Sequence, residues 1–288
     1  MRAPRPKKPV PLDIPPQMPG VGAWLVAGLD PSLSRTGYAL SLVQPDPGPM
    51  EMRSAAKWLA VGSVKPQTAA DPIWVRGKAM ALYLRSIIAT QADNLIFTHG
   101  SDPEILKLAA PRLGLIVSLE YPTPMNDFLV ALNRIIHLVF FDGDFHKRFA
   151  AVQVLATNAS TLRSLMGLTM RGAKNKKENI LRAYDFIDRG TWPSLDTDSC
   201  DAVLLSVMGH HAASIMLGFA DSVPERFKNS LCNSTQVAKG KGTRARIITK
   251  GLLHRPEYWY PYERSTYTLL VKDAANPKPG LKREQFAL

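Results

Sequence analysis

The sequence predicts an α/β fold with one mixed five-stranded sheet and helices on both of its faces. Three apolar segments with strand composition come first, at residues 23–30, 37–43 and 57–64, and a proline-rich turn separates the last two. Two further strand segments, at residues 113–120 and 152–156, alternate with helical segments. Consecutive strands favour an antiparallel meander, and alternation with helices favours parallel pairing, so the sheet is predicted to combine both.

The first helix is predicted over residues 73–91, because its apolar residues recur near helical spacing. Asp71 is the expected N-cap, and Pro72 is the expected first helical residue. Residues 93–112 have no clear period and are predicted to form a loop with at most a short helix. Further helices are predicted over residues 126–140, 157–167, 178–189 and 198–217.

The charge of the chain is concentrated at its two ends. Residues 1–20 are proline-rich and carry four basic residues and one acidic residue, so they are predicted to form an extended basic arm. Residues 221–288 carry thirteen basic and six acidic residues and are predicted to form a basic C-terminal extension to a domain at residues 21–220. With a net charge of +12, the chain is expected to bind a polyanion, foremost nucleic acid. A role of the basic ends in solubility alone stays open.

Several classes of protein are disfavoured. The longest apolar runs are far shorter than the roughly 18 residues that cross a membrane, and the basic N-terminus lacks the apolar centre of a secretory signal. Cys200 and Cys232 are the two cysteines, and both are expected to be free thiols in a reducing compartment. We therefore expect no membrane partner and a cytoplasmic location.

Four acidic residues lie at strand ends or at a helix start, where metal-binding and catalytic groups are usually found. Asp30 and Glu120 each end an apolar strand, and Asp198 and Asp201 share one face at the start of a helix. Carboxylates brought together repel one another unless a cation neutralises them, and all-oxygen ligation suits Mg²⁺ or Mn²⁺. These four residues are the predicted metal ligands of a two-metal phosphodiester hydrolysis.

Each acid also has a structural interpretation that the sequence leaves open. Asp198 could be a helix N-cap or a first-turn residue. Glu120 could be a surface acid before a proline turn, and Asp30 could close an Asx-turn with the backbone of Ser32. Any one of these acids could reach its position by chance. It is much less expected that chance places all four together, at two strand ends and one helix start.

The segments DPSLSRTGYAL, LIVSLEYP and DTDSCDAVLLSVMGHH, in this order, resemble the RuvC-type Holliday junction resolvases of the RNase H-like nuclease superfamily, which also contains the retroviral integrases. The resemblance covers roughly residues 23–217 and departs at Ser32, where the family often has glycine. The matching positions are Asp30, Pro31, Thr36, Gly37, Glu120, Asp198, Asp201 and Ala202.

The resemblance implies an RNase H-like fold with two Mg²⁺ ions, for which Mn²⁺ can substitute, held by Asp30, Glu120, Asp198 and Asp201. It implies that water attacks the phosphorus and leaves a 5′-phosphate and a 3′-hydroxyl. It also implies a lysine that contacts the scissile phosphate region, and Lys177 is chosen for this catalytic role, with Lys174 as the alternative. The residues expected to contact DNA are Arg35, Arg171, Lys174, Lys176 and Lys177. A solvated charge run before a helix is the competing interpretation of the lysines.

The implied activity is metal-dependent, structure-selective endonuclease cleavage that resolves four-way junctions, with branched DNA as partner and a homodimer as the acting form. The basic arm and the C-terminal extension suit a phage or viral version, so the expected location is the cytoplasm of a bacterial or phage-infected host cell, in association with DNA. An RNase H-like nuclease for flaps, forks or duplex DNA and a catalytically silent nucleic-acid-binding module remain alternatives. A sugar-kinase-type ATPase is disfavoured, because DPSLSRTG lacks the glycine-rich phosphate loop.

Two weaker features complete the sequence. His210 and His211 have apolar neighbours and are interpreted as helix residues, not ligands. Aromatic residues at positions 258, 259, 260 and 262 could stack on unpaired bases or pack in a small hairpin.

Overall fold

The structure is a computed structural model. It describes residues 14, 20–32, 34–45, 54–65, 71–100, 112–120, 132, 135–136, 140, 145, 148–168, 174–232, 251–254 and 259–261. Of the N-terminal arm predicted for residues 1–20, all but Ile14 and Gly20 lies outside the described residues.

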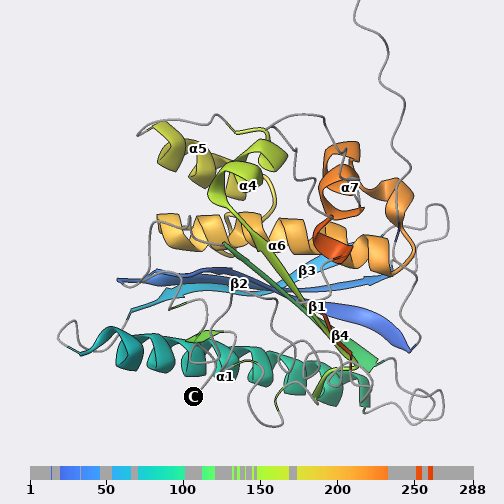
Figure 1. The fold of residues 1–288 in the computed structure, drawn as a ribbon, viewed down its shortest axis with the longest axis horizontal. Helices are drawn as coiled ribbons and strands as arrows, with labels where there is room; N and C mark the ends of the chain where they lie inside the picture. The colour runs from blue at the N-terminus through green and yellow to red at the C-terminus, as the bar shows by residue number, and fades with distance from the viewer. Residues whose placement is uncertain are drawn as a thin grey trace, which may run out of the picture.

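A mixed sheet with strand order β3-β2-β1-β4-β5-β6 forms the centre of the molecule (Figure 1). Its strands are β1 (Val21–Asp30), β2 (Thr36–Pro45), β3 (Ser54–Val64), β4 (Arg112–Glu120), β5 (Ala151–Thr157) and β6 (Trp259–Pro261). The first three strands pair antiparallel, and β1, β4 and β5 pair parallel. The predicted five-stranded arrangement, a meander followed by parallel strands, is confirmed, and it is RNase H-like.

A sixth strand, which the sequence did not predict, extends the sheet beyond β5. The three residues of β6 pair antiparallel with β5, so that Gln153 lies opposite Trp259 and Val152 opposite Tyr260. Two of the four C-terminal aromatic residues therefore belong to a sheet edge. The other two, at positions 258 and 262, lie outside the described residues.

The central strands are apolar because both faces of the sheet are covered. Six consecutive residues of β1 and all seven residues of β5 are buried, as expected for parallel strands between two helical layers. Side chains alternate along β1: Trp24 and Val26 belong to one core cluster, and Leu25 belongs to the other.

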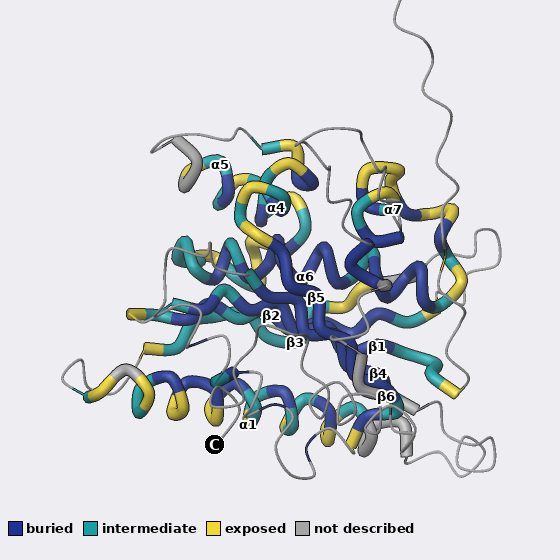
Figure 2. The backbone as a smooth tube through the Cα atoms, in the orientation of Figure 1, coloured by how far each residue is buried: buried dark blue, intermediate teal, exposed yellow. Residues whose placement is uncertain are grey.

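Helices cover both faces, as predicted. Helix α1 (Ile73–Gly100) lies along one face, and α6 (Thr197–Met216) lies along the other (Figures 1 and 2). Three shorter helices lie outside α6: α4 (Ala159–Met166), α5 (Lys174–Ala183) and α7 (Glu225–Cys232). Of the helix predicted over residues 126–140, the described residues 132, 135, 136 and 140 are helical.

Two helices differ from their predicted bounds by more than two residues. Helix α1 begins at Ile73, where the predicted range begins, but Pro72 precedes the helix and its carbonyl accepts the first hydrogen bonds. The helix continues to Gly100 through part of the predicted loop. An ion pair of 2.8 Å between Arg148 and Asp93 ties this continuation to the segment before β5. Helix α5 begins four residues earlier than predicted and ends at Ala183, and residues 184–189 form a turn instead.

Described parts of the predicted C-terminal extension pack into the main core. Phe227 and Leu231 of α7 and Leu252 of the short 3₁₀ helix η3 (Leu252–His254) are buried in the same cluster as α6. The division at residue 220 is not tested and stays a prediction.

Cys200 and Cys232 are buried free thiols, as predicted. Within the described ranges, the molecule contains no helix that is both long and apolar enough to span a membrane.

Candidate active site

Asp30 and Glu120 lie on neighbouring strands at the same edge of the sheet. β1 and β4 are parallel, and Leu29 lies opposite Leu119, so each acid is the next residue of its strand. Neighbouring strands lie about 4.8 Å apart, which brings the two carboxylates close together. The predicted strand-end positions of both acids are confirmed.

Two glycines allow α6 to lie directly against this part of the sheet. A Cβ on Gly28 would lie 2.1 Å from the carbonyl oxygen of Ala202, and a Cβ on Gly37 would lie 2.0 Å from that of Asp198. Both distances are far below a normal contact, so only glycine fits at either position. Because Gly37 pairs with Asp30 across β1 and β2, the first turn of α6 is held beside Asp30.

The electrostatics of Asp30 reflect this arrangement. Burial raises the pKa of Asp30 well above its usual value, and the charges of Asp201, Glu120 and Asp198 raise it further. Burial and then the charge of Asp201 raise the pKa of Glu120. Arg163 of α4 acts in the opposite direction on both carboxyls. The four predicted acids therefore interact electrostatically at one place in the fold.

Asp201 is held by a residue that the sequence did not single out. The Nδ2 of Asn179 donates a hydrogen bond of 2.6 Å to the Oδ1 of Asp201. Asn179 lies on α5 and is only 3% exposed, and its own buried Oδ1 accepts no hydrogen bond within the described part of the molecule. A bond from a buried amide to a carboxylate fixes the orientation of that carboxylate.

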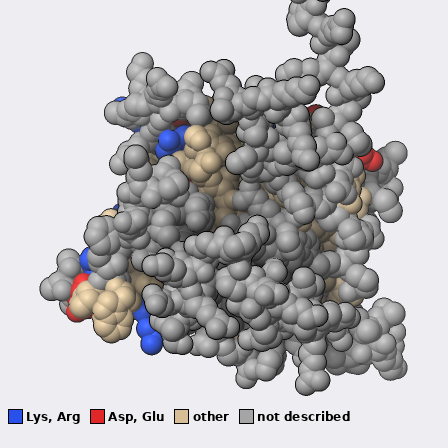
Figure 3. Space-filling model, in the orientation of Figure 1, with Lys and Arg blue, Asp and Glu red and all other residues tan. Residues whose placement is uncertain are grey.

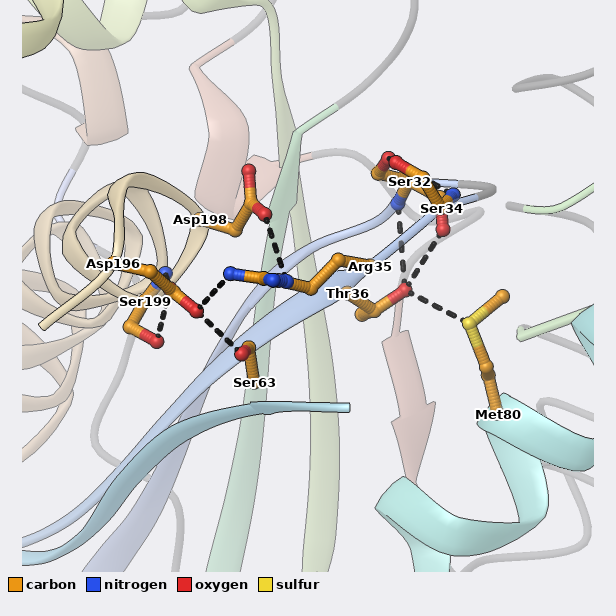
Figure 4. Close-up of polar contacts among 9 residues, drawn as sticks. All are labelled: Ser32, Ser34, Arg35, Thr36, Ser63, Met80, Asp196, Asp198 and Ser199. Atoms are coloured by element: carbon orange, nitrogen blue, oxygen red, sulfur yellow. Dashed lines mark hydrogen bonds and ion pairs between the residues drawn. The ribbon is translucent and has the colours of Figure 1, made fainter. Parts of the chain in front are cut away.

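A second network surrounds the first turn of α6 (Figure 4). The N-cap of α6 is Asp196, whose carboxylate accepts hydrogen bonds from the backbone and the hydroxyl of Ser199 and from Ser63. The Nη1 of Arg35 donates to the same carboxylate at 2.7 Å, and its Nε lies 3.9 Å from the Oδ2 of Asp198. Asp198 is therefore a first-turn residue and not the N-cap.

These contacts explain the low pKa of Asp196. Burial alone would raise the pKa of Asp196, but hydrogen bonds from Ser199, Ser63 and Arg35 outweigh it and lower the pKa to about 2. The carboxylate of Asp196 thus stays charged and joins the turn before β2, strand β3 and helix α6 at the candidate site.

The turn after β1 is closed by serine and threonine. The Ser32 backbone N–H donates to Thr36 Oγ1 at 3.4 Å, and the Thr36 hydroxyl contacts the Ser32 carbonyl at 3.2 Å (Figure 4). No hydrogen bond joins Ser32 to Asp30, although both residues are described. The alternative of an Asx-turn at Asp30 is therefore wrong.

The structure describes the side chains of only two of the five residues predicted to contact DNA. Lys177 is exposed on α5, two residues before Asn179. Lys174 and Lys176 belong to the same helix, but their side chains are not described, and Arg171 lies outside the described residues. Arg35 contacts Asp196 and Asp198. The DNA-contacting roles of all five basic residues stay predictions.

His210 and His211 lie within α6, as predicted for helix residues. His210 Nε2 lies 3.3 Å from Ser206 Oγ and is also hydrogen-bonded to Ser41, and the His210 ring packs on Trp58. Burial lowers the pKa of His210 to about 3 and that of His211 to about 4.

The donor set of the site suits a divalent cation. The carboxylates of Asp201, Glu120 and Asp198 raise the pKa of Asp30, and such a cluster would be stabilised by Mg²⁺ or Mn²⁺, which prefer oxygen ligands. As the side chains stand, no group of three or more His, Cys, Asp or Glu residues in the described ranges is arranged to hold an ion. The chemistry of the donors therefore fits a metal, but metal binding stays a proposal.

Sequence reasoning missed Asn179, Asp196 and Arg163. Only Asp196 has a local signal, because an aspartate three residues before Ser199 at a helix start is a capping pattern. Asn179 and Arg163 are ordinary residues of predicted helices, and only tertiary packing brings them to the acids.

No protein-family model and no curated protein matches the chain. Among solved structures, it is similar to a Thermus thermophilus RuvC structure at 17% identity and to T. thermophilus RuvC in complex with Holliday junction substrate at 16% identity. Each match covers 68% of this chain and 97% of the other, with a TM-score of 0.38. Similarity at this level carries no argument about function or fold. The fold is assigned instead from the order and pairing of the strands.

Proposed function

We propose that the chain is a metal-dependent, structure-selective DNA endonuclease that resolves four-way junctions by phosphodiester hydrolysis and leaves 5′-phosphate and 3′-hydroxyl ends. The observation that carries the proposal is the action of three carboxylates, from Asp201, Glu120 and Asp198, on the buried Asp30. Mutual repulsion of this kind costs stability, and a bound cation is the simplest compensation.

Asp30, Glu120, Asp198 and Asp201 would hold the metal. Two bound ions would activate a water molecule and stabilise the leaving oxygen. Asn179 would keep Asp201 in a fixed orientation, and Asp196 with Arg35 would keep the first turn of α6 in place. The net charge of +12 would attract the polyanionic substrate. We place this activity in a homodimer, because a four-way junction presents two symmetric strands, and in the reducing cytoplasm.

One observation favours a second candidate, a catalytically silent nucleic-acid-binding module. Within the described residues no ready metal cage exists, and Arg35 lies beside Asp198, where its charge offsets part of the repulsion. A silent module would bind DNA through the same net positive charge without cutting it.

Cleavage of labelled four-way, flap and linear duplex DNA, in Mg²⁺ or EDTA, tests the proposal with wild type and Asp30→Asn. Paired symmetric nicks on the junction, lost in EDTA and in Asp30→Asn, are the expected result. Cutting of flaps or duplex but not of junctions would move the function to general DNA processing. Binding without cutting would establish the silent module.

A readout independent of cleavage is the effect of Mg²⁺ on thermal unfolding. Mg²⁺ should raise the Tm of wild type by binding the folded state, and it should raise the Tm of Asp30→Asn less. Without metal, Asp30→Asn should be more stable than wild type at pH 7, because the substitution removes repulsion. A wild-type Tm that does not respond to Mg²⁺ or Mn²⁺ would contradict the metal site.

A further inference from the structure

Trp74, in the first turn of α1, is unusually exposed for a tryptophan. Its exposed fraction is 65%, whereas Trp24 in the core is fully buried. One helical turn further on, Lys78 is also exposed and lies on the same side of the helix. Tryptophan combines a large flat ring with one polar atom, so an exposed indole is typical of a binding surface.

This tryptophan lies near the end of the sheet at which β1 and β4 end in Asp30 and Glu120. Val64 at the end of β3 lies opposite Thr36, next to the pair of Gly37 and Asp30, so Lys65 follows β3 at the same edge. Two strand spacings, about 10 Å, separate β3 from β1. The first turns of α1 lie beneath this edge, where Met80 contacts Thr36. DNA bound at the acids would therefore pass within a few base pairs of Lys65 and Trp74.

The surroundings of Trp74 are basic. Between residues 65 and 92 the chain has one acid, Asp71, and its basic residues are Lys65, Arg76, Lys78 and Arg85. Lys65 and Lys78 are exposed, and neither forms an ion pair with a described residue. Figure 3 shows an uncharged cluster at the lower left, where α1 begins in Figure 1, with basic side chains and one patch of acidic atoms beside it. Among the described strands, β3 is the outermost one on that side of the sheet.

We propose that Lys65, Trp74 and Lys78, here called the α1 edge surface, hold a DNA strand with unpaired bases beside the acidic site. The two ammonium groups bind phosphates, and the indole stacks on a base that is not paired. Such a base is present in single strands and at forks and junctions but not in a blunt duplex. This inference rests on the proposed function only in requiring that the chain binds DNA.

The chemistry of the surface favours nucleic acid over a protein partner. Stacking on an aromatic ring is a sequence-tolerant way to bind a base, and flanking cations neutralise the phosphates. A protein-docking patch is depleted of lysine at its centre, whereas the exposed Lys78 follows Trp74 one turn later on the same side of α1.

The test measures DNA affinity in EDTA, so that no cleavage occurs. Fluorescence anisotropy compares a forked DNA, a single-stranded oligothymidine and a blunt duplex over a series of salt concentrations. The variants are Trp74→Ala, Lys65→Gln and Lys78→Gln, and the control is Lys57→Gln. Lys57 is an exposed lysine of the same strand β3, but it pairs with Leu42 toward the opposite end of the sheet.

Trp74→Ala should weaken binding of forked and single-stranded DNA about ten-fold and leave binding of blunt duplex nearly unchanged. Its salt dependence should match that of wild type, because no charge is removed. Lys65→Gln and Lys78→Gln should each lower the slope of log Kd against log salt by about 1, and Lys57→Gln should not. Oligothymidine should quench the tryptophan emission of wild type more than that of Trp74→Ala.

The outcomes separate this inference from the proposed function. If wild type binds none of the three DNAs, the proposed function fails. If wild type binds and Trp74→Ala binds equally well, or loses affinity equally for blunt duplex, the α1 edge surface is refuted. A change of oligomeric state in Trp74→Ala with unchanged DNA affinity would overturn the inference in favour of a protein contact.

Discussion

The close contact between Gly37 and the first turn of α6 predicts a large effect of one methyl group. In Gly37→Ala the new Cβ would lie 2.0 Å from the carbonyl oxygen of Asp198 and 2.3 Å from its carbonyl carbon. A relaxed contact between carbon and oxygen is about 3.3–3.6 Å, so the helix must retreat by more than about 1 Å. Both atoms belong to the backbone, which cannot rotate away as a side chain can.

The magnitude follows from three contributions. Overpacking of this kind costs about 1–3 kcal/mol. Displacement of the first turn also weakens the Asp196 cap and its contacts with Arg35 and Ser63, which adds about 1 kcal/mol. Alanine also restricts the unfolded chain more than glycine does, which stabilises the folded state by about 0.5–1 kcal/mol. We therefore expect Gly37→Ala to lower the free energy of unfolding by about 2 kcal/mol.

Urea unfolding followed by circular dichroism measures this loss as a lower transition midpoint with an unchanged m-value. Gly62→Ala is the matched control, because its new Cβ would meet only the hydroxyl end of Tyr38, at 2.8 Å, in the neighbouring strand. The control should cost less than about 0.5 kcal/mol, since that side chain can move. Equal stability of Gly37→Ala and wild type, or equal losses in both variants, would refute the close packing of the first turn of α6 against Gly37.

Three further predictions concern single contacts. Asn179→Ala should lower the free energy of unfolding by about 1–2 kcal/mol by removing a bond to the Asp201 carboxylate, and unchanged urea stability would contradict this. His210 is buried uncharged with a pKa of about 3, against 6.5 when unfolded, so the unfolded state binds its proton first and stability falls as the pH drops below 6.5. In His210→Gln this loss, measured by urea unfolding at several pH values, should be smaller by up to about 1.4 kcal/mol per pH unit, and an unchanged pH dependence would argue against a neutral buried ring. Arg35→Gln should raise the pKa of Asp196 above about 2 in an NMR titration, and a constant pKa would mean that the serines alone set it.

Much of the fold could be predicted because its signals are local. The strand ends at Asp30 and Glu120 were visible as apolar runs that stop at an acid before a turn. A buried parallel strand must be apolar on both faces, so its limits are recorded in consecutive residues. The start of α6 could be located to within a residue for a similar reason, since acidic residues precede a long apolar helix.

Where prediction failed, distant contacts decided the outcome. The extension of α1 beyond residue 92 has no helical period of its own, and the Asp93 ion pair with Arg148 bridges 55 positions. The strand β6 consists of three residues that pair with β5 about a hundred positions earlier in the chain. Short segments such as this one have too weak a local preference to be found without their partner.

The sequence by itself determined the order of strands and helices and the placement of four acids at strand ends and a helix start, because these features depend on neighbours within a few residues. Tertiary structure alone decided how those acids are held. The bond from Asn179 to Asp201, the contact of Arg35 with Asp196 and the seating of α6 on Gly28 and Gly37 join residues that are 22 to 178 positions apart. Nothing in the local chain encodes such distances, since they arise only when the sheet and its covering helix pack together.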